Sequence, residues 1–465
     1  MRTPVADFID GYIARDGVRA HMPGHKGAGP LGVEVRDITE IAGADVLSES
    51  VGILGESQQN ACTLFGTGAT LYSTEGSSLA VKAMLYSVMM HWKHCVKEME
   101  YSRPFILAAR NVHRAMLDGC ALLDLDLEFI QSGRVQGICS AVVTAQEVEQ
   151  SLKDCGQLPA AVYLTSPDYL GVQSDIAAIA EVCHKYGTLL AVDNAHGAYL
   201  AFLEESKHPI HLGADLCCDS AHKTLPVLTG GAYLHLHENI VSEVLDSARK
   251  GLTMFGSTSP SYLILQSLDL CNAYLEQEFR GGLAECVEKV LQFKKAAGDR
   301  GLHILEGEPL KIVIDTGASG YDGEEIAGEL REFVCCIGER KRSGIECEFA
   351  DHHTVVFMMS PQNGPEDWQM LYRWLDQTRL LQPGKAFAQA KTLGGEPSVR
   401  RMTIREAVFA ESEVIPVGEA EGRILAQETV SCPPAIPIAV SGEEISRSMI
   451  RVFEEYGIRD VSVVK

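Results

Sequence analysis

The segment DSAHKTLPVLTGGAYLH, residues 219–235, places a lysine between two apolar runs. Lys223 follows ADLCC by a few residues and directly precedes TLPVLTGGAYL, so both flanks are typical of buried structure. Burial of an ammonium group is unfavourable and lowers its pKa unless something compensates the charge. Lys223 therefore either ends a strand and reaches solvent, or has a chemical role in an apolar setting.

Five short apolar runs each end in a cluster of polar residues. The runs are ATLYST, RPFILAAR, AAVYLTSP, TLLAVDNAH and ADLCCDSAHK, and the clusters are STEGSS, RNVH, TSPDY, DNAH and DSAHK. Helical patterns alternate with these runs between residues 60 and 240, which predicts an α/β fold with a mostly parallel sheet. Ligands bind at the carboxyl ends of such strands, so we expect the clusters to converge on one cleft.

Three of these features together indicate pyridoxal phosphate. Gly76, Ser77 and Ser78 open a predicted helix after a strand, and the N–H groups, hydroxyls and helix dipole there suit a phosphate. Asp193 ends the buried run TLLAVD, where a carboxylate needs a cation or a donor, although it could equally cap the next turn. The cofactor aldehyde needs a lysine Schiff base and its ring nitrogen an anionic partner, which Lys223 and Asp193 would supply.

The composition bounds the class of protein. A chain of 465 residues predicts more than one domain, and its net charge of −23 disfavours binding to nucleic acid or to a membrane surface. The beginning of the chain has no apolar targeting segment, so we expect a cytoplasmic protein. The 14 cysteines lie mostly in apolar runs and predict reduced thiols. Adjacent pairs such as Cys217 and Cys218 would point to opposite faces of a strand, and we predict no metal site.

The patterns along the chain divide it into three parts. Residues 1–60 are rich in loop signals and predict an N-terminal arm, residues 61–280 a large cofactor-binding domain, and residues 281–465 a smaller α+β domain. Ser174 is predicted to cap the helix that follows it. GEEIAGELREFVCCIGERK predicts a helix, LLQPGKAFAQAKTLGGEPS a linker, and SCPPAIPIAVSGE has too many prolines for a central strand.

The ordered segments HMPGHKG, STEGSS, RNVHRA, TSPDYLGVQSDI, VDNAHGA, DSAHKTL, STSPSYLILQSLD and PPAIPIAVSGE resemble the Orn/Lys/Arg decarboxylase family. The resemblance covers nearly the whole chain and fits the compact form that lacks an N-terminal wing domain. It implies the aspartate-aminotransferase fold, which is fold type I of the enzymes that use pyridoxal phosphate. It also implies decarboxylation of a basic amino acid, namely arginine, lysine or ornithine, and a homodimer or higher oligomer with shared sites.

The resemblance also implies roles for individual residues. Lys223 would hold the cofactor, Asp193 would pair with the ring nitrogen and His113 would stack on the ring. His196 would lie near the oxygen edge of the ring, and a neighbouring histidine or Lys223 would return a proton to the substrate carbon. The residues implied around the phosphate are Ser77, Ser78, Ser220 and His222, and Thr258 and Ser259 from the partner chain.

Two departures from the family pattern affect substrate identity rather than the cofactor site. Glu75 stands where many relatives carry asparagine, and Asp168 where threonine is common. A basic substrate side chain needs a carboxylate, and the segment SGEE resembles the carboxyl-terminal motif of the family. Glu443 and Glu444 either serve that purpose or cap the helix predicted at EISRSMIRVF.

Other functions stay open at this point. Another reaction of the same cofactor, by an aminotransferase or a lyase, would use the same residues. SAHK matches the S-x-x-K motif of serine acyl-transferases, but the companion motifs are missing and Ser220 follows a strand rather than opening a helix. A non-catalytic relative that binds the cofactor is a third class, which the presence of both Lys223 and Asp193 disfavours.

Overall fold

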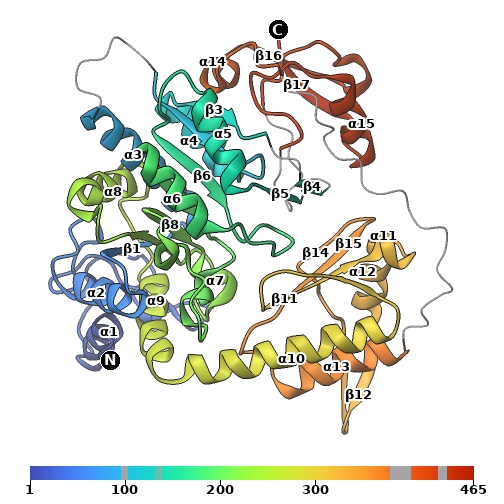
Figure 1. Cartoon of the computed structure of the whole chain (residues 1–465). Helices are drawn as coiled ribbons and strands as arrows, with labels where there is room; N and C mark the ends of the chain where they lie inside the picture. The colour runs from blue at the N-terminus through green and yellow to red at the C-terminus, as the bar shows by residue number, and fades with distance from the viewer. Residues whose placement is uncertain (96–102, 132–133, 137–138, 378–398, 428–436) are drawn as a thin grey trace.

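The computed structural model describes residues 1–95, 103–131, 134–136, 139–377, 399–427 and 437–465. A seven-stranded sheet dominates the first half of the chain, in the order β1-β9-β8-β7-β6-β2-β3 (Figure 1). Its strands are β1 Ala69–Ser73, β2 Phe105–Ala108, β3 Asp126–Phe129, β6 Ala161–Thr165, β7 Leu189–Asp193, β8 Leu216–Asp219 and β9 Ala232–Leu236.

The pairing of these strands brings the five polar clusters to the same end of the sheet, at the carboxyl ends of the parallel strands. Strands β8, β7, β6, β2 and β3 are parallel, while β9 pairs antiparallel with both β8 and β1. Two antiparallel pairings in succession make β1 run in the same direction as β8. The predicted mostly parallel α/β sheet is therefore confirmed, although β9 and the edge strand β3 were not among the predicted runs.

Helices cover both faces of this sheet, as expected for buried parallel strands. Tyr163 of β6 faces a core that it shares with α3 and α4, whereas Val162 and Leu164 face the core beside α5 and α6. The helices of this half are α1 Pro4–Ala14, α2 Ile53–Phe65, α3 Gly76–Cys95, α4 Arg114–Leu123, α5 Ala145–Asp154, α6 Ile176–Tyr186, α7 Ala221–Thr224, α8 Val241–Phe255 and α9 Tyr262–Tyr274. Asp175, and not Ser174, caps α6 by accepting the N–H of Ala178, because its side chain lies one residue nearer to the helix.

The N-terminal segment is anchored to the core. Val5 and Ile9 of α1 are fully buried, and Asp269 of α9 accepts the backbone N–H groups of Val5 and Ala6. Between α1 and α2 the chain forms only turns and the short helix η1 Glu34–Arg36, in agreement with the loop signals in this region.

A long helix leads away from the large sheet. Helix α9 continues through the π-helical turn η4 Leu275–Phe279 into α10 Arg280–Asp299, which runs along a second sheet of order β10-β11-β15-β14 (Figure 1). The elements of this region are β10 His303–Leu305, β11 Lys311–Asp315, α11 Thr316–Ser319, α12 Gly323–Glu332, β12 Val334–Ile337, β13 Arg340–Ser343, β14 Phe349–Ala350, β15 Thr354–Met358 and α13 Pro365–Gln377.

The helix predicted over residues 323–341 is wrong in its second half. Helix α12 ends at Glu332, and the following residues form a hairpin of β12 and β13. The β-branched and cysteine-rich run VCCI alternates between exposed and less exposed positions, with Cys335 buried and Cys336 exposed, which is the period of a strand.

The last described residues form α14 Ile404–Phe409, β16 Ser412–Pro416, α15 Arg447–Glu455 and β17 Asp460–Val464, and β16 pairs with β17. Helix α14 packs against α4 beside the large sheet (Figure 1). The predicted linker, residues 380–398, lies outside the described residues, and so does Cys432. Residues 437–443 form no strand. None of the helices in the described ranges is long and apolar enough to cross a membrane. The division of the chain at residues 60 and 280 remains a prediction.

Candidate active site

Lys223 lies in the short helix α7, which begins directly after β8. Its Nζ is 3.0 Å from Nε2 of His196, which follows β7. Lys223 is half-buried rather than fully buried, because α7 turns it from the strand end toward the edge of the sheet. The lysine therefore lies where two polar clusters meet, and it retains access to a ligand.

Asp193 is the last residue of β7 and is only 3% exposed. One of its oxygens accepts the backbone N–H of Ala195 at 3.1 Å and lies 3.5 Å from the Cys218 thiol, and the other accepts the Tyr163 hydroxyl at 3.2 Å. The carboxylate thus caps the following turn and also faces the α3 and α4 side of the sheet. Its geometry is therefore compatible with both predicted roles, as the cap of the next turn and as the partner of the ring nitrogen of the cofactor.

His113 is the N-cap of α4. Its Nδ1 accepts the N–H of Ala115 at 3.1 Å, so the remaining ring proton of a neutral imidazole is on Nε2. Burial lowers the pKa of His113; the charge of Asp193 opposes this and the charge of Lys223 adds to it. Those interactions place His113 in the same electrostatic environment as the two predicted cofactor residues.

His196 is buried and neutral. Burial lowers its pKa well below the ordinary value, and the positive charges of Lys311 and Lys223 lower it further. The ring of Tyr169 packs edge-on against the imidazole with the centroids 5.4 Å apart. Nε2 of the neutral imidazole can therefore accept a hydrogen bond from the amine of Lys223.

The residues predicted to surround a phosphate come from two neighbouring helix starts. Ser220 occupies the N-cap position of α7, but its hydroxyl donates to Ser77 at 2.7 Å and does not cap the helix. Nδ1 of His222 donates to the carbonyl of Gly231 at 3.1 Å. Ser77 and Ser78 are half-buried in the first turn of α3. Ser220 opens a helix, contrary to the expectation from sequence, but its hydroxyl is directed to Ser77.

Gly76 allows this arrangement through its backbone. Its φ of +73° belongs to the left-handed region, and its N–H donates to the carbonyl of Gly230 at 2.7 Å. A Cβ at this position would meet no atom within 4 Å, so conformation and not crowding accounts for glycine here.

Three of the buried polar atoms that have no partner in the described part of the chain lie near the carboxyl ends of these strands. They are Nδ1 of His196, Oγ1 of Thr165 and Oδ1 of Asn111, which follow or end β7, β6 and β2. Such atoms are costly unless a ligand or water satisfies them. Together with the lysine, the carboxylate and the serine hydroxyls, they fit a polar aromatic cofactor that carries a phosphate, and pyridoxal phosphate is such a group.

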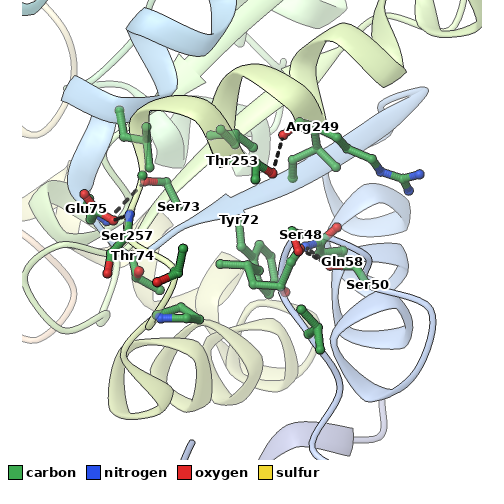
Figure 2. Close-up of a pocket in the computed structure, with 18 of the residues that line it drawn as sticks. Ser48, Ser50, Gln58, Tyr72, Ser73, Thr74, Glu75, Arg249, Thr253 and Ser257 are labelled. Carbon is green, nitrogen blue, oxygen red and sulfur yellow. Dashed lines mark hydrogen bonds between the residues drawn. The ribbon is translucent and has the colours of Figure 1, made fainter. Parts of the chain in front are cut away.

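Thr258 and Ser259 are exposed and lie in the loop between α8 and α9. A cavity of about 190 Å³ lies between the end of β1 and the loop after α8, and the residues that line it include Glu75, Arg249 and Thr258. Figure 2 shows Glu75 and Ser257 side by side in its lining, where the N–H of Ser257 donates to Glu75 at 2.6 Å. Glu75 thus contacts the loop that carries Thr258 and Ser259.

Asp168, the second departure from the family pattern, is buried in the turn after β6. Burial raises its pKa to about 6, although Ser140 and the N–H of Val172 donate to its carboxylate. The carboxylate is directed into the protein and is saturated there. This geometry gives Asp168 a structural task.

Glu443 is fully buried and forms a bidentate ion pair with Arg110. The two guanidinium nitrogens lie 2.7 and 2.9 Å from its oxygens, and the N–H of Val440 donates at 2.8 Å. Ser446 caps α15, and Glu444 accepts from Arg401, so the hypothesis that either glutamate caps this helix is wrong. Both oxygens of Glu443 are occupied by groups of its own chain.

The sequence hypothesis missed several residues that support the site. Tyr163 and Tyr169 were interpreted only as parts of strand-end runs, and Arg110 only as part of RNVH. Lys311 opens the apolar run KIVID of β11, so a lysine next to an apolar strand is the signal that could have identified it, as it did for Lys223.

Comparison with known proteins gives a consistent result. The family model "Orn/Lys/Arg decarboxylase, major domain" matches residues 33–307, and "Orn/Lys/Arg decarboxylase, C-terminal domain" matches residues 386–456. An arginine decarboxylase of Bacillus subtilis is 28% identical over 96% of this chain and 92% of its own length. One from Halalkalibacterium halodurans is 26% identical over 98% and 93%.

The solved structures that resemble this chain show the same fold. A lysine decarboxylase of Francisella novicida superposes with a TM-score of 0.78 at 14% identity, over 100% of this chain and 81% of its own. The constitutive lysine decarboxylase of E. coli gives 0.77 at 17% identity, over 100% and 82%. The fold is therefore that of fold type I enzymes, and the chain belongs to the Orn/Lys/Arg decarboxylase family.

Proposed function

We propose that the protein is a pyridoxal-phosphate-dependent decarboxylase of a basic amino acid. The observation that carries the proposal is the convergence of Lys223, Asp193 and the Ser77–Ser220 hydroxyl pair on one edge of the large sheet. A lysine amine, a buried carboxylate and a phosphate-binding helix start are the groups that this cofactor needs from a protein.

Each residue then has a defined task. Ser77, Ser78, Ser220 and His222 would hold the phosphate, Asp193 the ring nitrogen and His113 the ring face. When bound, the cofactor supplies an electron sink for the carbon that loses carbon dioxide. Lys223 would anchor the cofactor and, with neutral His196 3.0 Å away, hold the proton that the substrate carbon receives.

Arginine is the substrate that we propose to test first, followed by lysine and ornithine. Two relatives that span nearly the whole chain are named arginine decarboxylases. A net charge of −23 also attracts a cationic substrate, although the field of the whole protein does not define the pocket. Amine and carbon dioxide as products identify decarboxylation, whereas a keto acid would identify transamination and contradict the proposal.

Replacing Lys223 with alanine tests the anchor. We expect the variant to lose the visible absorbance of lysine-bound cofactor and to lose activity by about 1,000-fold or more. Lys250→Ala, at an exposed lysine of α8, is the matched control and should keep both. A borohydride-reducible cofactor adduct that persists in Lys223→Ala would contradict the assignment.

We further propose a homodimer in which Thr258 and Ser259 complete the partner's site. Their exposure and their position in a surface loop support this arrangement. Lys223→Ala and an inactive Ser259 variant should then regain partial activity when mixed, since one hybrid site would carry both intact residues. If mass spectrometry shows that subunits have exchanged and no activity returns, the sites are not shared.

A further inference from the structure

Lys311 is a second lysine in apolar surroundings, and it is more deeply buried than Lys223. It begins β11 of the four-stranded sheet and is only 1% exposed. Its Nζ donates to the backbone carbonyls of Asp168 at 3.0 Å and Tyr169 at 3.1 Å. These bonds join the second sheet to the turn that follows β6 of the large sheet.

The same turn is held by two more contacts from the second sheet. The hydroxyl of Tyr169 donates to Glu348 at 3.0 Å, and its ring packs edge-on against Phe349 with the centroids 5.4 Å apart. The other side of this ring packs against His196, also at 5.4 Å, and Nε2 of His196 lies 3.0 Å from Nζ of Lys223. A continuous series of contacts thus leads from β11 to the reactive lysine.

Electrostatic interactions connect the same residues. Burial lowers the pKa of Lys311; Glu308, Asp168 and Glu348 oppose that effect, and Lys223 adds to it. The groups that face His196 are Lys311, Lys223, His113 and His222, and each of them disfavours protonation of the imidazole. Lys311 is therefore a fixed cation whose charge reaches both members of the His196–Lys223 pair.

We propose that Lys311 is a positioning residue for Lys223, which it affects by fixing the Asp168–Tyr169 turn so that Tyr169 braces His196. In this role Lys311 acts through the turn, by its hydrogen bonds to the carbonyls of Asp168 and Tyr169. Its charge also favours the unprotonated amine, the form in which Lys223 is a nucleophile. The role assigned to Lys223 rests on the proposed function, but the geometry and the test below do not require a bound cofactor.

The test follows the reactivity of Lys223 in cofactor-free protein. An amine-reactive acylating reagent is applied over a range of pH, and peptide mass spectrometry gives the labelling rate of Lys223 alone. Lys311→Met keeps the length of the side chain but removes its charge and donors. We expect the midpoint of the labelling profile to rise by roughly 0.5–1 pH unit, because repulsion between the two ammonium groups is lost. Lys311→Arg should restore most of the shift.

Lys294→Met is the matched control. Lys294 of α10 is a partly buried lysine that faces the same Glu308, but it has no described contact with the Asp168–Tyr169 turn. This variant should leave the Lys223 profile unchanged. An equal shift in both methionine variants would mean that general charge loss is responsible, which would overturn the proposal.

A second pair of variants keeps the test decisive if Lys311→Met fails to fold. Tyr169→Leu removes the ring that contacts His196 and should raise the midpoint in the same direction, because water reaches the pair. Tyr169→Phe keeps the ring and loses only the bond to Glu348, so it should shift the midpoint less than Tyr169→Leu does. An unchanged profile in folded Lys311→Met or in Tyr169→Leu would overturn the proposal. Failure to bind pyridoxal phosphate would instead contradict only the proposed function.

Discussion

Two buried aspartates end adjacent parallel strands and have very different surroundings. Asp219, at the end of β8, accepts from Nε2 of His208 at 3.0 Å, from Nε2 of His235 at 3.2 Å and from the side-chain amide of Asn194 at 2.7 Å. Burial by itself would raise the pKa of Asp219, but the two histidines outweigh burial and hold the pKa well below its usual range. This carboxylate is saturated by its own chain.

Asp193, at the end of β7, has weaker donors. They are a tyrosine hydroxyl, a cysteine thiol and one backbone N–H. Both carboxylates face away from solvent, yet they lie on opposite faces of the sheet, because Asp193 lies beside Cys218 and Asp219 beside Cys217. Burial of a carboxylate alone therefore does not identify a ligand-binding site. The strength of the donors already around it separates a structural group from one that can serve a ligand.

We expect the largest effect, a loss of activity, when Asp193 is replaced. Asp193→Asn should preserve the fold and lower kcat by about 1,000-fold, or about 4 kcal/mol of transition-state stabilisation, since an amide cannot supply the negative charge that the ring nitrogen needs. Steady-state kinetics together with the melting temperature measure both parts. Near-normal kcat with cofactor bound would show that Asp193 is only a turn cap.

The next effect is on stability and concerns Asp219. Asp219→Ala should lower the free energy of unfolding by about 3–4 kcal/mol, because two buried imidazoles and the amide of Asn194 lose their acceptor. Urea denaturation of the cofactor-free protein measures it. Asp193→Ala should cost less in the same assay, since its donors are fewer and weaker. An equal loss in both variants would remove the proposed distinction.

The smallest effect concerns Asp168, whose pKa of about 6 lies above that of an unfolded chain. The folded protein therefore binds more protons between about pH 4 and 6, so this contribution to stability is present below pH 4 and is lost as pH rises through 6. Asp168→Asn should be more stable than the unaltered chain at pH 7–8, by about 1–2 kcal/mol. The difference should vanish near pH 4.

Unfolding free energies measured at a series of pH values check this prediction. A variant that is less stable than the unaltered chain at pH 8 would show that the ionised carboxylate is needed in the turn. That result would show that Asp168 resembles Asp219, whose ionised carboxylate is stabilised by donors of its own chain.

The parallel sheet could be predicted from the sequence alone, because apolar runs of strand length alternate with helical patterns and admit few other folds. The edge of the site could be predicted as well, since polar residues that follow parallel strands must gather at one end. For that reason the sequence could predict the candidate site residues Lys223, Asp193, His113, His196 and the serines around Ser77. Strand β9 was missed because it runs antiparallel, so the polar residues that follow it lie at the opposite end of the sheet from the five clusters, and β12 because a short apolar run fits either period.

Contacts between segments that are distant in the sequence determine which charged residues are already paired within the protein. The pairing of Arg110 with Glu443 joins residues 333 positions apart, and the contact of Lys311 with the Asp168–Tyr169 turn joins residues 142 and 143 positions apart. No local pattern records such partners, because hydrophobic burial brings the segments together without reference to their spacing along the chain. The sequence therefore reveals which residues can do chemistry, whereas packing determines which of them are left able to do it.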